Sequence, residues 1–189
     1  MVKIFISGGC KNGKSAYAQK LALALRRPGT PLYYAATMIS ADSEDDARIK
    51  RHRGDRRGLG FETIEAGRDI PEALSACDWR GTFLLDSVTA LLANEMFTQD
   101  NAVRPDAYMK VAGDLTGLAG RAGNIVIVSD YIYSDACLYD DLTEAYRIGL
   151  AYVDRQLAAI SDVVLEICGG IYITHKGGHV LKELLYGLG

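Results

Sequence analysis

Short apolar runs alternate with longer amphipathic segments along this chain. Each run has the length and the β-branched or aromatic content of a buried strand. The predicted strands are residues 2–7, 32–36, 61–65, 82–86, 124–130, 163–168 and 170–174. The predicted helices between them are residues 14–26, 42–57, 70–76, 88–97, 107–119 and 140–160. This order predicts a single α/β domain over residues 1–189, with a mostly parallel central sheet flanked by helices and a C-terminal edge hairpin.

The longest predicted helix, residues 140–160, carries apolar side chains at helical intervals. We expect this face of the helix to pack inward, against the sheet. Its members are Leu142, Ala145, Ile148, Tyr152 and Leu157.

The C-terminal stretch contains two histidines four residues apart, His175 and His179. Gly177 and Gly178 lie between them and argue against a helix there. With no third ligand in sight, this spacing does not predict a metal site.

The first strand leads into a glycine-rich loop and then into a helix. The loop consists of Gly8, Gly9, Cys10, Lys11, Asn12, Gly13, Lys14 and Ser15, which is the G-x-x-x-x-G-K-S spacing of a phosphate-binding P-loop. We expect Lys14 to reach the β- and γ-phosphates of a nucleoside triphosphate and the Ser15 hydroxyl to bind Mg²⁺. An ordinary glycine turn is the alternative, but the strand before the loop and the helix after it favour the P-loop.

Composition narrows the class of protein. Hydrophobic residues make up 49% of the 189 residues and charged residues 24%, as is typical of a globular protein. The net charge of −3 gives no reason to expect nucleic-acid binding. We expect no membrane span and no signal peptide, because no apolar segment is long enough and the chain goes straight into a strand. The four cysteines lack C-x-x-C spacing, so we expect reduced thiols in a cytoplasmic protein.

The strand at residues 82–86 ends in a carboxylate, Asp86. An aspartate in this position suits the Walker B role, in which the carboxylate holds Mg²⁺ directly or through water. An aspartate after a strand is also a common helix cap or turn residue. The P-loop upstream favours the Mg²⁺ role.

His52 lies among arginines in the predicted helix at residues 42–57. Arg48 precedes it by four residues and Arg56 follows it by four, so a helix places the three side chains on one face. Nearby cations disfavour the imidazolium, and a neutral imidazole is a nucleophile. The same arginines suit a triphosphate. The alternative is a solvated basic helix face with an incidental histidine, and the charge pattern alone favours that alternative.

Taken together, several of these motifs resemble one known family. Besides the P-loop, the matching segments are Tyr34-x-Ala36-Thr37, Arg48-Ile49-x-x-His52-Arg53-x-x-Arg56, Thr63-Ile64-Glu65, and Leu84-Leu85-Asp86-Ser87-x-Thr89 followed by Asn94. The chain resembles the bifunctional adenosylcobinamide kinase / adenosylcobinamide-phosphate guanylyltransferase of cobalamin biosynthesis. A P-loop is common to many families, whereas a P-loop with R-I-x-x-H-R at this distance is specific.

The resemblance implies two reactions. The γ-phosphoryl group of ATP or GTP passes to the aminopropanol hydroxyl of adenosylcobinamide. GTP then guanylylates a histidine, and GMP passes to adenosylcobinamide phosphate to give adenosylcobinamide-GDP. The resemblance also implies a RecA-like P-loop NTPase fold and a homotrimer with sites between subunits.

The resemblance implies a role for individual residues as well. It implies that His52 is the covalent nucleophile and that Lys14 is also catalytic. It implies that Ser15 and Asp86 bind Mg²⁺. The residues that it implies for nucleotide binding are the whole P-loop and Ala36, Thr37, Met38, Arg53, Gly54, Asp55, Arg56, Glu65 and Asp86.

The chain departs from the family pattern at two places. Where the family has N-E-V-G after a buried strand, this chain has Asp130-Tyr131-Ile132-Tyr133-Ser134-Asp135, and the usual Arg-Pro after the histidine is Arg56-Arg57. These changes spare the nucleotide-binding residues and bear on the corrinoid side and on the kinase half of the activity. Two other functions stay open, namely a small-molecule kinase without guanylyltransferase activity and a non-catalytic GTP-binding regulatory or scaffold subunit.

Overall fold

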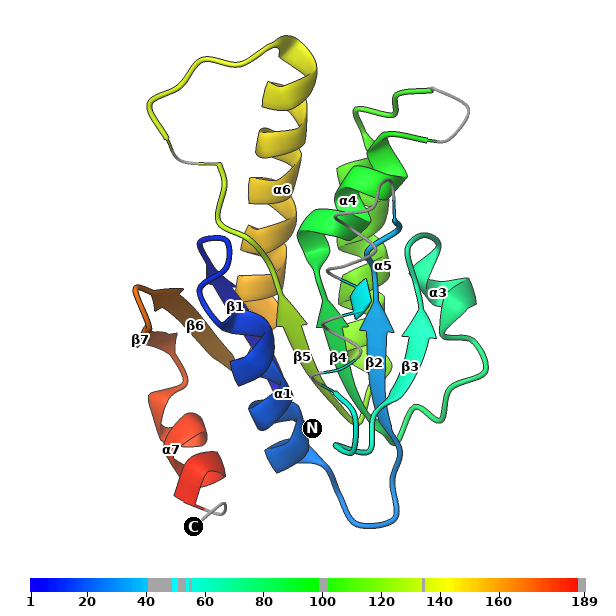
Figure 1. Cartoon of the computed structure of the whole chain (residues 1–189), viewed down its shortest axis with the longest axis vertical. Helices are drawn as coiled ribbons and strands as arrows, with labels where there is room; N and C mark the ends of the chain where they lie inside the picture. The colour runs from blue at the N-terminus through cyan, green and yellow to red at the C-terminus, as the bar shows by residue number, and fades with distance from the viewer. Residues whose placement is uncertain (41–48, 51–53, 55, 99–101, 134, 187–189) are drawn as a thin grey trace.

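A computed structural model describes residues 1–40, 49–50, 54, 56–98, 102–133 and 135–186 of the chain. Its centre is a sheet of seven strands in the order β3-β2-β4-β5-β1-β6-β7 (Figure 1). The strands are β1 (Lys3–Gly8), β2 (Leu32–Ala36), β3 (Glu62–Glu65), β4 (Thr82–Asp86), β5 (Asn124–Val128), β6 (Val163–Cys168) and β7 (Ile171–Lys176). Neighbouring strands are parallel except β7, which runs antiparallel to β6 at the edge. The predicted mostly parallel sheet and its C-terminal edge hairpin are confirmed.

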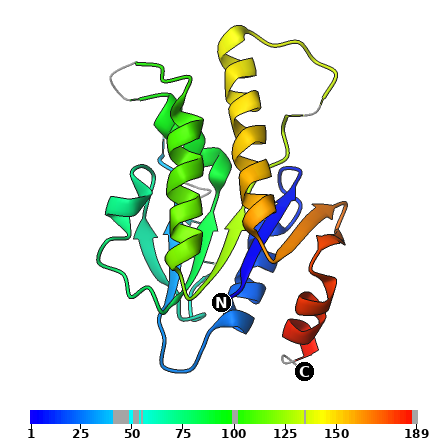
Figure 2. The ribbon, with the colours of Figure 1, turned by 180° about the vertical axis from the view of Figure 1, so that it is seen from behind.

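Helices cover both faces of this sheet. They are α1 (Lys14–Leu25), α3 (Ile70–Ala73), α4 (Val88–Met96), α5 (Ala107–Arg121), α6 (Asp141–Ile160) and α7 (Gly178–Tyr186). Helices α1 and α7 lie on the face seen in Figure 1, and α5 and α6 lie on the face seen in Figure 2. Among the described residues, no helix is both long enough and apolar enough to cross a membrane.

The strands bury side chains on both faces, as a parallel sheet between two helical layers requires. Phe83 and Leu85 of β4 pack with the layer that contains α4, α5 and α6. Leu84 lies between them in the sequence and packs with α1 on the opposite face. This period of two explains why the central strands are almost continuously apolar.

Some predicted boundaries differ from the structure. The predicted helix at residues 42–57 lies mostly outside the described residues, although residues 49–50 and 54 are helical and residues 56–60 form turns. Helix α3 ends at Ala73 rather than 76, and β5 ends at Val128 rather than 130.

The predicted inward face of the helix at residues 140–160 is buried at Leu157, half-buried at Ala145 and wrong at the other three positions. Ile148 is 64% exposed, and Leu142 and Tyr152 are also exposed. The buried side of α6 instead consists of Arg147, Gly149, Leu150, Val153, Asp154 and Leu157. The N-terminal half of α6 extends beyond the ends of the strands (Figures 1 and 2). Its apolar residues therefore have no sheet beneath them, and the packing of the C-terminal half sets the rotation of the helix.

The expectation that no helix forms around Gly177 and Gly178 is wrong. Gly177 makes the turn with a φ of 74°, and α7 begins at the next residue. Leu181 of α7 is buried in the apolar cluster that also holds the inward face of α1. His175 consequently lies on β7 and His179 on α7, so the two histidines are on different elements.

Candidate nucleotide-binding site

The glycine loop joins the end of β1 to the first turn of α1 at the carboxyl edge of the sheet (Figure 1). Gly13 precedes α1 with a φ of 91°, a left-handed conformation that glycine adopts without steric cost. Gly8 has a φ of 150°, and a Cβ atom there would collide with the carbonyl oxygen of Ile167. Both positions therefore require glycine, as in the predicted P-loop.

Asn12 braces this loop against the neighbouring strand. Its amide nitrogen donates a hydrogen bond to the carbonyl oxygen of Ile167 in β6. Its amide oxygen accepts hydrogen bonds from the backbone nitrogen of Lys14 at 3.4 Å and from the Lys14 Nζ at 3.3 Å. The edge hairpin also meets α1 through stacked rings of Tyr17 and Tyr172, whose centroids are 4.1 Å apart. The β6–β7 hairpin thus supports the conformation of the P-loop.

Lys14 is buried at the base of the loop, with 5% of its side chain exposed. Its Nζ donates to the carbonyl oxygen of Gly9 at 2.5 Å and lies 2.8 Å from the Asp130 Oδ1. The ammonium group is therefore held toward the loop. In the structure, the partners of this ammonium group are the Asp130 carboxylate, the Gly9 carbonyl oxygen and the Asn12 amide oxygen. A nucleotide that binds to the loop would contact the same cation.

The predicted residues outside the loop line up along the same edge of the sheet. Glu65 lies opposite Ala36, and Ala36 lies opposite Asp86. Val128 continues this row from Asp86 to Ile6 of β1, just before the P-loop. Because β4 is two strands from β1, Asp86 has its backbone about 10 Å from that of β1. A phosphate group and a metal ion can bridge such a distance.

Asp86 is held by an aromatic side chain that the sequence analysis did not single out for this purpose. The Tyr34 hydroxyl donates to the Asp86 Oδ2 at 2.6 Å. Burial raises the pKa of Tyr34 far above its ordinary value, and the Asp86 carboxylate raises it further, so the hydroxyl keeps its proton. The buried Arg56 guanidinium lies over the Tyr34 ring, 3.6 Å from its centroid. Arg56 and Asp86 therefore both contact the side chain of Tyr34, Arg56 at its ring and Asp86 at its hydroxyl.

Helix α4 follows Asp86 in the sequence, but Asp86 does not cap it. The Ser87 hydroxyl accepts a hydrogen bond from the backbone nitrogen of Ala90, so Ser87, not Asp86, caps α4. The backbone nitrogen of Ser87 donates to the fully buried Thr37 hydroxyl at 2.6 Å, and that hydroxyl donates to the Ser87 carbonyl at 2.8 Å. The Thr37 side chain therefore ties β2 to β4.

A buried polar cluster lies behind Asp130. The Ser129 hydroxyl donates to the Asp154 Oδ2 at 2.9 Å. Burial raises the pKa of the Asp154 carboxyl to about 7, and the nearby charge of Asp130 also raises it. The pKa of Tyr133 is raised first by its own burial and then by Asp154. The sequence analysis did not identify this cluster, although Asp130 follows a buried strand much as Asp86 ends one.

The remaining predicted site residues divide into two groups. The first group lies within the described residues. In it, Ser15 and Met38 are half-buried, and the exposed residues are Gly9, Cys10, Lys11, Gly54 and Glu65. The second group lies outside the described residues and consists of His52, Arg53 and Asp55. The role of His52 therefore stays a prediction.

The described residues contain no group of three or more histidines, cysteines, aspartates or glutamates placed to hold a metal ion. A hydroxyl at Ser15 and a carboxylate at Asp86 are oxygen donors of the kind that Mg²⁺ prefers. Mg²⁺ also keeps several waters and phosphate oxygens as ligands, so two protein donors are enough for a nucleotide-bound ion.

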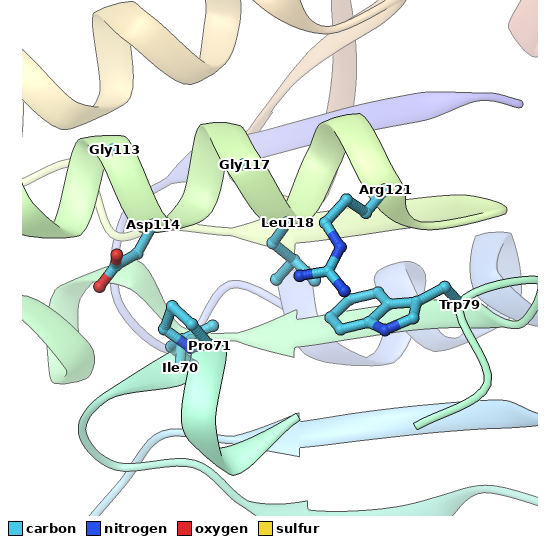
Figure 3. A pocket seen from close by; sticks show the side chains of 8 residues that line it. All are labelled: Ile70, Pro71, Trp79, Gly113, Asp114, Gly117, Leu118 and Arg121. Carbon is cyan, nitrogen blue, oxygen red and sulfur yellow. The ribbon is translucent and has the colours of Figure 1, made fainter. Parts of the chain in front are cut away.

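A hollow of about 160 Å³ lies elsewhere, between α3 and α5 (Figure 3). The guanidinium of Arg121 lies over the Trp79 ring, 4.1 Å from its centroid. The other lining residues are Ile70, Pro71, Gly113, Asp114, Gly117 and Leu118. None of these residues belongs to the predicted nucleotide site.

The arrangement of the elements is similar to that of a solved ATPase domain. One solved structure, described as an ATPase domain, is 12% identical, with a TM-score of 0.50 over 87% of this chain and 68% of that chain. The flagellar accessory protein FlaH from Methanocaldococcus jannaschii is 12% identical, with a TM-score of 0.47 over 93% of this chain and 78% of that chain. At such identity the likeness to the ATPase domain bears on the fold alone, which is the predicted RecA-like P-loop fold.

Comparison with curated proteins gave no match. A family model described as cobinamide kinase / cobinamide phosphate guanyltransferase matches residues 4–174. That span contains the P-loop with its buried lysine, and the Arg56, Tyr34 and Asp86 contacts at the edge of the sheet. This chain therefore belongs to the cobinamide kinase / cobinamide phosphate guanyltransferase family.

Proposed function

We propose that this chain catalyses both reactions of its family on adenosylcobinamide, with one set of residues for the triphosphate and His52 as the carrier of GMP. The observation that carries the proposal is the shared carboxyl edge of the sheet. The P-loop lysine, the Asp86 carboxylate and the Arg56–Tyr34 pair all lie along this edge, within a chain whose family has these two activities.

In the kinase reaction, the backbone N–H groups of the P-loop and the start of α1 bind the phosphates of ATP or GTP. Lys14 neutralises charge on the β- and γ-phosphates. Ser15 and Asp86 would hold Mg²⁺, which would supply positive charge to the phosphate oxygens. The hydroxyl of adenosylcobinamide attacks the γ-phosphorus, the bond from that phosphorus to the β-phosphate oxygen breaks, and a nucleoside diphosphate leaves.

In the guanylyltransferase reaction, a neutral His52 imidazole attacks the α-phosphorus of GTP. A nitrogen–phosphorus bond forms, the bond to the β-phosphate oxygen breaks, and pyrophosphate leaves. A phosphate oxygen of adenosylcobinamide phosphate then attacks the same phosphorus, and the nitrogen–phosphorus bond breaks to give adenosylcobinamide-GDP. Arg53, Gly54, Asp55, Arg56 and Glu65 take part in nucleotide binding here. The buried Arg56 lies over the ring of Tyr34, whose hydroxyl donates to Asp86.

Covalent labelling tests the proposal directly. The protein is incubated with Mg²⁺ and GTP labelled at the α-phosphorus, then denatured and assayed for bound label before and after acid treatment. We expect acid-labile label on the wild type, none on His52→Ala, and unchanged label on His179→Ala, which removes an exposed histidine from α7. Equal labelling of His52→Ala, or no label on the wild type, would refute the histidine intermediate.

A parallel assay separates the two alternatives that the sequence left open. Phosphorylation of adenosylcobinamide without any covalent label would leave a kinase that lacks guanylyltransferase activity. Binding of GTP without phosphoryl transfer or label would leave a non-catalytic GTP-binding subunit.

The assembly and location of the protein belong to the same proposal. We expect residues 1–189 to act as one nucleotide-binding domain within a homotrimer. The edge strand β7 supports an assembly, because its outer side has no strand partner among the described residues and Ile171, Tyr172 and Ile173 are exposed. The four cysteines are unpaired, which suits the reducing cytoplasm. Analytical ultracentrifugation tests the trimer, and a monomer at all concentrations would contradict it.

A further inference from the structure

Asp130 lies between the two halves of the proposed phosphate site. It follows β5 directly, and β5 is the strand between β1, which carries the P-loop, and β4, which carries Asp86. Its carboxylate is 18% exposed, so it can be reached from solvent. No role in the proposed reactions has yet been given to this residue.

The backbone around Asp130 is held on both sides and at the residue itself. The backbone nitrogen of Ser129 donates to the Ile6 carbonyl at 2.9 Å, and that of Tyr131 donates to the Gly8 carbonyl at 2.9 Å. The backbone nitrogen of Asp130 donates to the Thr89 hydroxyl at 2.9 Å. These bonds fix the carboxylate to the strand that leads into the P-loop, which is the rigid support that a reacting group requires.

The ion pair with Lys14 places this carboxylate beside the terminal phosphate. The Asp130 Oδ1 lies 2.8 Å from the Lys14 Nζ, and a P-loop lysine reaches the β- and γ-phosphates when a nucleotide binds. The three donors of the Lys14 ammonium group face the Gly9 carbonyl, the Asn12 amide oxygen and the Asp130 carboxylate. A phosphate oxygen that replaces the 3.3 Å contact with Asn12 leaves the carboxylate as a neighbour. Phosphate and carboxylate then lie on adjacent sides of one cation.

The chain after Asp130 leads away from the phosphates toward an apolar surface. Tyr131, Ile132, Leu138 and Tyr139 are exposed there. Figures 1 and 2 both show the chain leaving β5 close to the P-loop, where the Tyr131 nitrogen donates to the Gly8 carbonyl. These exposed side chains suit contact with a large, partly apolar acceptor. Asp130 stands at the start of this segment and contacts Lys14, so it joins this surface to the proposed phosphate site.

We propose that Asp130 is the catalytic base of the phosphoryl transfer, which accepts the proton of the acceptor's hydroxyl group as the oxygen attacks the γ-phosphorus. This inference rests on the proposed kinase activity and assigns the proton acceptor for it. The oxygen–hydrogen bond breaks, an oxygen–phosphorus bond forms, and the nucleoside diphosphate leaves with the electron pair of the broken γ-phosphorus–oxygen bond. The Asp130 carboxyl later releases its proton to water.

A simpler role for Asp130 makes a different prediction. If it only holds Lys14 in place, its removal changes nucleotide binding, and saturating nucleotide restores the rate. If it is the base, its removal lowers the rate at saturating substrates while nucleotide still binds. Asp130→Asn keeps the size of the side chain and removes the proton acceptor, so it separates these roles.

The matched control is Asp114→Asn. Asp114 is also a lysine-paired carboxylate, with its Oδ2 3.0 Å from the Lys110 Nζ and 23% of its side chain exposed. It lies on α5, away from the P-loop. Each protein is assayed for phosphorylation of adenosylcobinamide at saturating Mg²⁺-ATP, for ATP affinity by calorimetry, and for covalent label from GTP labelled at the α-phosphorus.

We expect Asp130→Asn to lower the rate of phosphoryl transfer by about 100-fold or more, the usual contribution of a general base. Its ATP dissociation constant should not rise by more than about threefold, and its labelling at His52 should stay at the wild-type level. Asp130→Glu, which keeps a carboxylate, should recover at least about tenfold of the lost rate. Asp114→Asn should match the wild type in all three assays.

A rate for Asp130→Asn within about threefold of the wild type would overturn the inference, and so would a loss that saturating ATP restores. No gain of rate in Asp130→Glu over Asp130→Asn would overturn it as well. If the wild type itself transfers no phosphoryl group, the proposed kinase activity fails and the inference fails with it. Wild-type activity therefore distinguishes the failure of this inference from the failure of the proposed function.

Discussion

The buried carboxyl of Asp154 makes a quantitative prediction about stability and pH. Burial raises its pKa to about 7, whereas the ordinary value is 3.8. Asp154→Asn keeps an oxygen that can accept the hydrogen bond from the Ser129 hydroxyl and removes the titrating group. The variant therefore behaves like a wild-type protein in which Asp154 is always neutral.

The sign follows from proton binding. The folded protein binds this proton more tightly than the unfolded chain does, so the stabilisation is present at low pH and is lost as the pH rises through 7. Between pH 5 and pH 8, the wild type should lose roughly 2–3 kcal/mol of unfolding free energy relative to Asp154→Asn. Most of this change should occur below pH 7, because the carboxyl is ionised in both states above it.

Urea unfolding of both proteins at several pH values from 5 to 8 measures the effect. The difference between the two unfolding free energies removes contributions that are the same in both proteins. The unfolding free energy of Asp154→Asn, measured relative to that of the wild type, should be higher at pH 8 than at pH 5. A difference that stays constant within about 0.5 kcal/mol across this range would refute the assignment of a raised pKa to Asp154.

Two further predictions concern the site. Gly8→Ala should lower the melting temperature and weaken ATP binding, because its Cβ would collide with the Ile167 carbonyl oxygen, whereas Gly9→Ala has nothing within 4 Å of its Cβ. Equal behaviour of the two variants in thermal unfolding and ATP titration would contradict this. Tyr34→Phe should lower the unfolding free energy by about 1.5–3 kcal/mol, because it removes a buried hydrogen bond to the charged Asp86. Urea unfolding measures this loss, and an unchanged midpoint would show that the hydroxyl contributes nothing.

Local pattern was enough for most of the fold. Runs of apolar residues identified the strands, because a strand between two helical layers is buried on both faces. Pattern failed where burial depends on distant parts of the chain. The apolar face of α6 points partly to solvent because the N-terminal half of the helix extends beyond the ends of the strands. Helix α7 forms because Leu181 packs into the apolar cluster that contains α1.

The site shows the same division. The spacing of the P-loop predicted Gly8, Gly13 and Lys14, because the loop geometry is encoded in consecutive residues. The Asp86 carboxylate was predicted from the strand that ends in it, and the structure adds that Ser87 is the helix cap. The pattern around His52 stays a prediction, since this residue lies outside the described part of the chain.

The sequence by itself determined the class of fold, the phosphate-binding loop and the motifs shared with the family. Only the tertiary structure decided which groups surround that loop. Tyr34 and Asp86 are 52 residues apart in the sequence, and Asn12 and Ile167 are 155 apart. Such pairs meet because of the order of strands in the sheet, and periodicity along the chain carries no information about that order. For the same reason, the ion pair between Lys14 and Asp130 depends on β5 lying beside β1 in the sheet.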